Sequence, residues 1–98
     1  MTFSIEKERL TAVSSDSRPA GFVSFPRIRP DLVNIDNIIV YPDFRNQDLE
    51  DRMMEALLPH LEQQHQKAAL TCPKAQQYVR SHPQWRHILP GEMHFTTH

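Results

Sequence analysis

The sequence predicts a single α/β domain of the α+β type, with a mixed sheet and the element order ββββ-α-β-α. Three observations lead to this prediction. Residues 1–40 show strand-like alternation and β-branched runs, the apolar period becomes helical from Leu49, and a short apolar strand then precedes a helix that begins at a proline. A chain of 98 residues has room for one hydrophobic core and no second, so we expect residues 1–98 to form one domain.

Alternating apolar residues predict three strands in the first part of the chain. Segments 3–5 and 10–13 flank a charged stretch at 6–8, which is typical of a hairpin. A polar loop at 14–19 then leads to a third strand at 20–25, whose side chains alternate between two faces.

The strongest β segment is 31–40, which is rich in valine and isoleucine and is closed by Pro42. Its apolar residues lose strict alternation in the middle, which predicts a β-bulge near Asp36-Asn37. Arg27 and Arg29, which lie between two prolines just before this segment, favour a turn or an edge strand over a phosphate-binding track.

A helical period follows over 49–61, where the apolar residues are Leu49, Met53, Ala56, Leu57 and Leu61. Pro59 falls inside this pattern and removes one backbone donor. We therefore expect a kink or a split near Leu58.

Residues 67–71 predict a short strand, buried on both sides if it is central. Pro73 suits the first turn of the last helix, which His82-Pro83 should end. Because a helix joins strands four and five, we expect them to be parallel through a right-handed crossover, with a ligand cleft where they splay. Residues 91–98 are expected to be a loose tail.

The bulk composition excludes several classes of function. A net charge of −1 and a pI near 6.6 give no field that would attract nucleic acid. The single cysteine cannot form an internal disulfide, and neither a signal-peptide core nor an apolar run of membrane-spanning length is present. We therefore expect a cytoplasmic protein without a nucleic-acid or membrane partner.

Two motifs resemble those of the GNAT superfamily of N-acetyltransferases. The run Val40-Tyr41-Pro42-Asp43-Phe44-Arg45-Asn46-Gln47-Asp48-Leu49 resembles its acetyl-CoA motif, in which a strand ending V-x-P precedes R-G-x-G-[IV]-[GA] and a helix. The pattern Cys72-Pro73-x4-Tyr78-Val79-x2-His82-Pro83-x-Trp85 resembles the minimal members of the superfamily, which are small uncharacterised N-acetyltransferases. The resemblance covers residues 3–88 and implies the acyl-CoA N-acyltransferase fold.

The resemblance also implies a cofactor site and a substrate class. Acetyl-CoA would lie between strands four and five, with its thioester carbonyl at a backbone N–H near Ile39 and its pyrophosphate on the N–H groups that open the central helix. The acceptor would be an amine, either a small molecule or a peptide. The residues implied for the cofactor are Ile39, Val40, Arg45, Asn46, Gln47, Asp48, Leu49 and Glu50.

The chain departs from this motif where the superfamily has glycine or alanine. Asn46, Asp48 and Glu50 occupy those positions and Asp51 follows, so Asp48 is predicted to cap the helix and the carboxylates to repel a pyrophosphate. Like charges at about 4 Å repel by about 1–4 kcal/mol, depending on the dielectric. The sequence therefore leaves two functions open: an acetyltransferase, or an interaction module of the same fold with weak or lost acetyl-CoA binding. Asn37, which stands where the superfamily often has a histidine, cannot act as a base.

Candidate catalytic residues lie in the second motif. The resemblance implies that Cys72 is an acyl acceptor or a thiol close to the substrate, and a helix N-terminus favours a thiolate; the alternative is a buried structural cysteine. Tyr78 could donate a proton, although its helical spacing also fits packing. His82 is expected to cap the helix C-terminus, and Trp85 to be a core or lid aromatic.

The histidines do not have the spacing of a zinc site. His94 and His98 lie four positions apart in the tail without a third ligand, and a proline separates His82 from His87. We therefore predict no metal. The sequence does not predict an oligomeric state.

Overall fold

A computed structural model describes residues 1–91, apart from the side chains of Asn46 and Gln47. The predicted tail lies outside the described residues from position 92 onward. In chain order the elements are β1 (Thr2–Ile5), β2 (Arg9–Val13), β3 (Pro19–Ser24), β4 (Arg27–Arg29), β5 (Leu32–Ile35), β6 (Asn37–Val40), the 3₁₀ helix η1 (Pro42–Gln47), α1 (Leu49–Gln63), β7 (Lys67–Leu70), α2 (Pro73–Ser81) and the 3₁₀ helix η2 (Pro83–Ile88).

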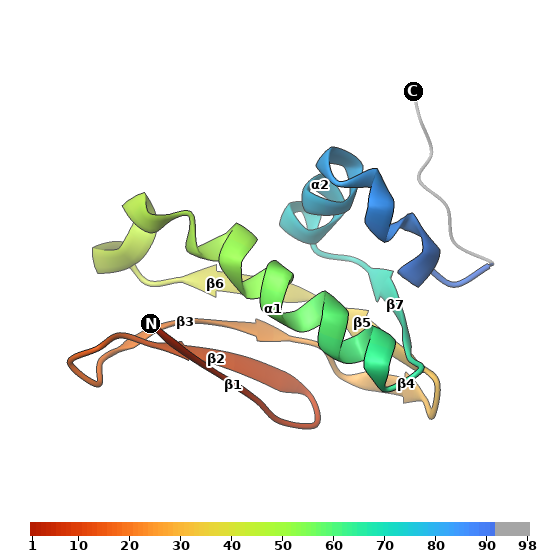
Figure 1. Cartoon of the computed structure of the whole chain (residues 1–98), viewed down its shortest axis with the longest axis horizontal. Helices are drawn as coiled ribbons and strands as arrows, with labels where there is room; N and C mark the ends of the chain where they lie inside the picture. Colours follow the sequence, from red (N-terminus) through yellow and green to blue (C-terminus); the bar gives the residue numbers. More distant parts are fainter. Residues whose placement is uncertain (92–98) are drawn as a thin grey trace.

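The strands form two small sheets (Figure 1). One is antiparallel, in the order β1-β2-β3-β6, and the other has the order β4-β5-β7, with β5 and β7 parallel. This arrangement confirms the mixed α+β class and the parallel return of the strand after α1. Segment 27–29 is indeed an edge strand, since β4 lies at one end of its sheet.

The segment predicted as one long strand is shared between the two sheets. Its first half, β5, pairs with β7, and its second half, β6, pairs with β3. Between them the Asp36 N–H donates to the Ser24 carbonyl at 3.1 Å, which marks the bulge expected near Asp36-Asn37. Since β7 pairs with β5 and ends at Leu70 without pairing with β6, the two sheets separate at this point, as the predicted cleft requires.

Helix α1 lies along both sheets and supplies much of the core (Figure 1). Its buried side chains follow the helical period: Leu49, Met53, Met54, Leu57, Leu58 and Leu61. The prediction of a split near Leu58 is wrong, because α1 is one helix through Pro59. Pro59 withdraws only its own backbone donor, and buried leucines on both sides of it hold the helix against the sheets.

The remaining elements enclose the short strand β7. It lies at the end of its sheet, yet Ala68, Ala69 and Leu70 are buried because both α1 and α2 pack against the strand. The two 3₁₀ helices were not predicted; each begins at a proline that follows a strand or helix end. None of the helices in residues 1–91 has the length and hydrophobicity needed to cross a bilayer.

Candidate functional site

A cleft of about 470 Å³ opens beside β6, the half of the shared segment that does not pair with β7. Its walls come from β6, from η1, from the start of α1 and from the start of α2. The residues that line it are Ile38, Ile39, Val40, Arg45, Leu49, Glu50 and Lys74. The cleft therefore lies where the sequence predicted a ligand site.

The edge of β6 presents backbone groups to this cleft. A Cβ added to Gly21 of β3 would collide with the Ile39 carbonyl oxygen, and the Tyr41 N–H donates to β3 at 2.9 Å, so Ile39 turns its backbone toward β3. Successive residues of a strand point these groups in opposite directions. The amides that face the cleft are therefore those of Ile38 and Val40, one residue to either side of the predicted Ile39.

Asp48 has an unusual backbone at the start of α1. Its φ of 49° and ψ of 37° lie in the left-handed region, and its side chain makes no capping hydrogen bond. Asp48 is therefore the N-cap residue that the sequence predicted, and its carbonyl accepts the first helical hydrogen bond from the Arg52 N–H at 3.1 Å, but its side chain does not cap the helix. The chain makes a left-handed turn where the resembled motif has a glycine, a residue that adopts this conformation without a Cβ penalty.

A cross-helix ion pair offsets one of the carboxylates at the cleft. The Lys74 ammonium of α2 lies 2.5 Å from a Glu50 carboxylate oxygen of α1, and the two side chains are 56% and 41% exposed. The carboxylate in the cleft is therefore paired, and Arg45 adds a second positive charge to the lining. The sequence alone had predicted carboxylates without such partners. A pair this exposed contributes at most about 1 kcal/mol.

Cys72 lies at the point where the sheet divides. The Ile35 carbonyl accepts hydrogen bonds from the N–H groups of Thr71 and Cys72, both at 3.2 Å, just before the chain leaves β5. The Cys72 side chain is 6% exposed, belongs to the hydrophobic core and is not among the residues that line the cleft. The thiol of Cys72 is therefore buried in the core and does not open into the cleft.

Tyr78 and His82 border a second, smaller cleft of about 210 Å³ between α1 and α2. Burial raises the pKa of Tyr78, and the negative charges of Glu55 and Asp51 raise it further, so the phenol keeps its proton at neutral pH. His82 Nδ1–H donates to the Tyr78 carbonyl at 2.8 Å, and the His82 N–H to the Val79 carbonyl at 3.2 Å. His82 is therefore the helix C-cap that the sequence predicted.

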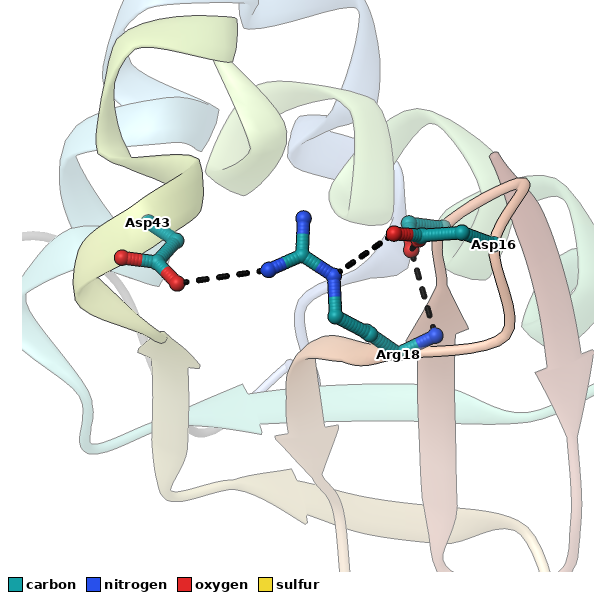
Figure 2. Close-up of polar contacts among 4 residues, drawn as sticks. Asp16, Arg18 and Asp43 are labelled. Carbon is teal, nitrogen blue, oxygen red and sulfur yellow. Dashed lines mark hydrogen bonds and ion pairs between the residues drawn. The ribbon is translucent and has the colours of Figure 1, made fainter.

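Arg18 ties the loop before β3 to η1, the segment that leads into the cleft (Figure 2). Its Nε lies 2.8 Å from Asp16 and a terminal nitrogen 3.4 Å from Asp43, while the guanidinium carbon lies 5.2 Å from the centre of the Phe44 ring. A hydrogen bond from the Ser14 hydroxyl is the largest cause that lowers the pKa of Asp16. These contacts hold η1 from outside the cleft.

Five of the predicted cofactor residues come together at the cleft: Ile39, Val40, Arg45, Leu49 and Glu50. Asp48 shapes the turn without lining the cleft, and the side chains of Asn46 and Gln47 are outside the described structure. Ile38 and Lys74 were missed. Strand alternation could have identified Ile38, whereas Lys74 carries no signal in a sequence, because it reaches the cleft from another helix.

The remaining aromatic and histidine predictions have less bearing on the cleft. Trp85 packs partly buried against the core and stacks on His87, with ring centroids 5.6 Å apart. Over residues 1–91 no three side chains of the ligand type gather as a metal set. His94 and His98 lie outside the described residues.

Comparison with known proteins identifies the fold and the family. A family model described as GCN5-related N-acetyl-transferase matches residues 9–88. The solution structure of a protein from Staphylococcus aureus, proposed to be a GCN5-like N-acetyltransferase, aligns with a TM-score of 0.72 at 13% identity, over 99% of this chain and 95% of that one. The crystal structure of Tetrahymena GCN5 aligns with a TM-score of 0.58 at 9% identity, over 93% of this chain and 64% of that one.

The structural likenesses establish the fold, and the family match covers most of the sequence. Comparison with curated proteins yielded no match. The division of the sheet, the cleft at its fork and the match over residues 9–88 agree with one another. This chain belongs to the GCN5-related N-acetyltransferase family.

Proposed function

We propose that this protein transfers an acetyl group from acetyl-CoA to an amine, either a small molecule or a peptide. The observation that carries the proposal is the cleft of about 470 Å³ at the fork of the sheet, bordered by the open edge of β6 and the first turn of α1. When bound, acetyl-CoA supplies an acetyl group already activated as a thioester. The protein would supply position and hydrogen bonds.

The residues at the cleft fit such a cofactor in three respects. The outward amides of Ile38 and Val40 can hold the amide-rich pantetheine arm or a thioester carbonyl in the manner of an added strand. Arg45 and Lys74 bring positive charge to the place where the diphosphate would lie. The left-handed turn at Asp48 keeps the backbone shape that the motif glycine provides.

Two side chains of the second motif were candidates for the chemistry, and their surroundings favour Tyr78 over Cys72. Tyr78 keeps its proton at neutral pH, so it can donate a hydrogen bond or a proton but cannot act as a base. Cys72 is the candidate acyl acceptor, but its burial favours direct attack by the amine on the donor. No residue is proposed as a base, since Asn37 replaces the histidine of the motif.

Two observations support the second candidate, an interaction module. Glu50 places a carboxylate in the cleft itself, and Ile39, at the rim of the cleft, and Tyr41, whose ring lies near that of Phe22, are exposed apolar side chains. A module of this kind would bind a partner through these exposed side chains and would not need acetyl-CoA. Acetyl-CoA binding separates the two functions.

Thermal unfolding with increasing acetyl-CoA tests the proposal. A ligand at about a hundred times its Kd raises the free energy of unfolding by about 2.7 kcal/mol. We expect a concentration-dependent rise in the melting temperature, together with acetylation of at least one amine in a panel of small amines and peptides, followed by mass spectrometry. An unchanged melting temperature at millimolar acetyl-CoA would favour the interaction module.

The route of the acetyl group is tested with Cys72→Ser. If the amine attacks directly, this variant acetylates the amine at an unchanged rate, and no acetyl label appears on the protein. If Cys72 relays the group, the wild type carries a label that maps to Cys72, and the variant loses both label and turnover.

A further inference from the structure

The positive charge of Lys74 is unfavourable for the helix to which it belongs. Lys74 follows Pro73 in the first turn of α2, where the helix dipole is positive and no acidic residue is present. A lysine there weakens its own helix. Its charge is balanced instead from α1, where Glu50 lies in a first turn that favours a carboxylate.

The Glu50–Lys74 pair also separates the two clefts. Both residues line the cleft of about 470 Å³ at β6, and both line the cleft of about 210 Å³ beside Tyr78. The ion pair, with the ammonium 2.5 Å from the carboxylate, thus borders both clefts. Parting the two side chains would free the ammonium for a ligand in either cleft.

We propose that Lys74 is the anion-binding residue of this cleft and that Glu50 is its internal competitor. An entering diphosphate takes the ammonium from the carboxylate, and Glu50 turns toward solvent. This inference rests on the proposed function, since it names the chain's own means of receiving the diphosphate of CoA. It also makes the affinity depend on a residue outside the glycine-rich motif.

The exposure of the pair makes such an exchange feasible. The Lys74 and Glu50 side chains are 56% and 41% exposed, so both remain hydrated and neither is locked in place. An exposed ion pair of this kind favours the paired over the separated state by a factor of about five at most. A diphosphate carries more charge than one carboxylate and also meets the N-terminal end of α1, so it can displace Glu50.

The test measures the binding of two probes by calorimetry: CoA, and pantetheine, which lacks the diphosphate. Glu50→Gln should bind CoA about fivefold more tightly than the wild type, because the competitor is removed. Lys74→Met should bind CoA about tenfold more weakly, with a smaller dependence on salt, because a charged contact is lost. Neither variant should change its affinity for pantetheine.

Two matched controls contact His87, away from the clefts: Glu62 near the end of α1 and Lys67 at the start of β7. Glu62→Gln removes the carboxylate that pairs with His87, and Lys67→Met removes the ammonium that donates to the His87 carbonyl. Each makes the same charge change as its counterpart, away from the clefts. Both should bind CoA as the wild type does, and circular dichroism should show that all four variants are folded.

The outcomes separate this inference from the proposed function. Equal CoA affinities for the wild type, Glu50→Gln and Lys74→Met would overturn the exchange while leaving CoA binding intact. Absence of CoA binding in both the wild type and Glu50→Gln would overturn both proposals. Binding by Glu50→Gln with none by the wild type would support the competition in its strongest form.

Discussion

The rings of Tyr78 and His82 stack one helical turn apart, with their centroids 4.1 Å apart and their planes inclined by 17°. The same histidine donates from Nδ1 to the Tyr78 carbonyl. One side chain thus closes the last turn of α2 and covers the face of the buried phenol ring. The end of the helix and the environment of Tyr78 are therefore coupled.

Replacing His82 with alanine should lower the free energy of unfolding by about 1 kcal/mol. The variant loses a hydrogen bond to a carbonyl at the helix end as well as the ring contact. Urea denaturation measures the change. Gln77→Ala, an exposed position on the same helix, is the control and should stay within about 0.5 kcal/mol of the wild type. Equal stability of the two variants would contradict the capping role.

Stability should fall at high pH because of Tyr78. Its pKa in the folded protein is raised above the ordinary value of 10.0, first by burial and then by Glu55 and Asp51. The unfolded chain therefore ionises first, and the contribution of Tyr78 is complete below about pH 10 and is lost as the pH rises through the folded pKa. Tyr78→Phe should remove this dependence.

A tyrosinate absorbance titration checks the same shift directly. The chain has two tyrosines, and Tyr41 is exposed. The late part of the tyrosinate transition should belong to Tyr78 and should disappear in Tyr78→Phe. A variant whose transition has the same midpoint as that of the wild type would argue against the raised pKa of Tyr78.

Gly21→Ala should destabilise the protein by about 1–3 kcal/mol. An added Cβ would meet the Ile39 carbonyl oxygen, and because that atom is backbone in a paired strand, the strand itself must move. Gly91→Ala is the matched control, since a Cβ there meets nothing within 4 Å. Thermal unfolding of both variants decides the point, and similar losses at the two positions would refute the close approach of β3 and β6.

The left-handed turn at Asp48 predicts which of two substitutions gives the more stable protein. Glycine and alanine both remove the carboxylate, so their difference reports on the backbone alone. With φ at 49°, Asp48→Gly should be more stable than Asp48→Ala by about 1 kcal/mol, because alanine carries the Cβ penalty of this conformation. Urea denaturation measures this difference. An alanine variant as stable as the glycine variant would show that the turn is not left-handed in solution.

Local patterns in the sequence were sufficient to predict most of the fold. Alternation and β-branched residues predicted the strands, and the loss of alternation located the bulge at Asp36. The helical period located α1, although Pro59 suggested a break that the buried neighbours of the proline prevent. These features are local, so a short window of sequence contains them.

The site depends on relationships that a local pattern does not contain. Glu50 was interpreted as an unopposed charge because Lys74 lies on another helix and meets it only in the folded protein. Asp48 occupies the predicted N-cap position, but aspartate is favoured both as a side-chain cap and in left-handed turns, so its identity does not reveal which of the two it forms. The backbone dihedral angles make the distinction.

The sharing of residues 32–40 between the two sheets has a consequence for cooperativity. Residues 32–35 pair in one sheet and residues 37–40 in the other, and Asp36 joins them directly. Unpairing either half should therefore disturb the other half. The amide protons of β5 and β6 that are hydrogen-bonded within the sheets should therefore exchange with deuterium at one common free energy, close to that of global unfolding, whereas the outward amides of Ile38 and Val40 should exchange faster. The fork at which the cleft opens would then be among the last parts of the molecule to fluctuate apart.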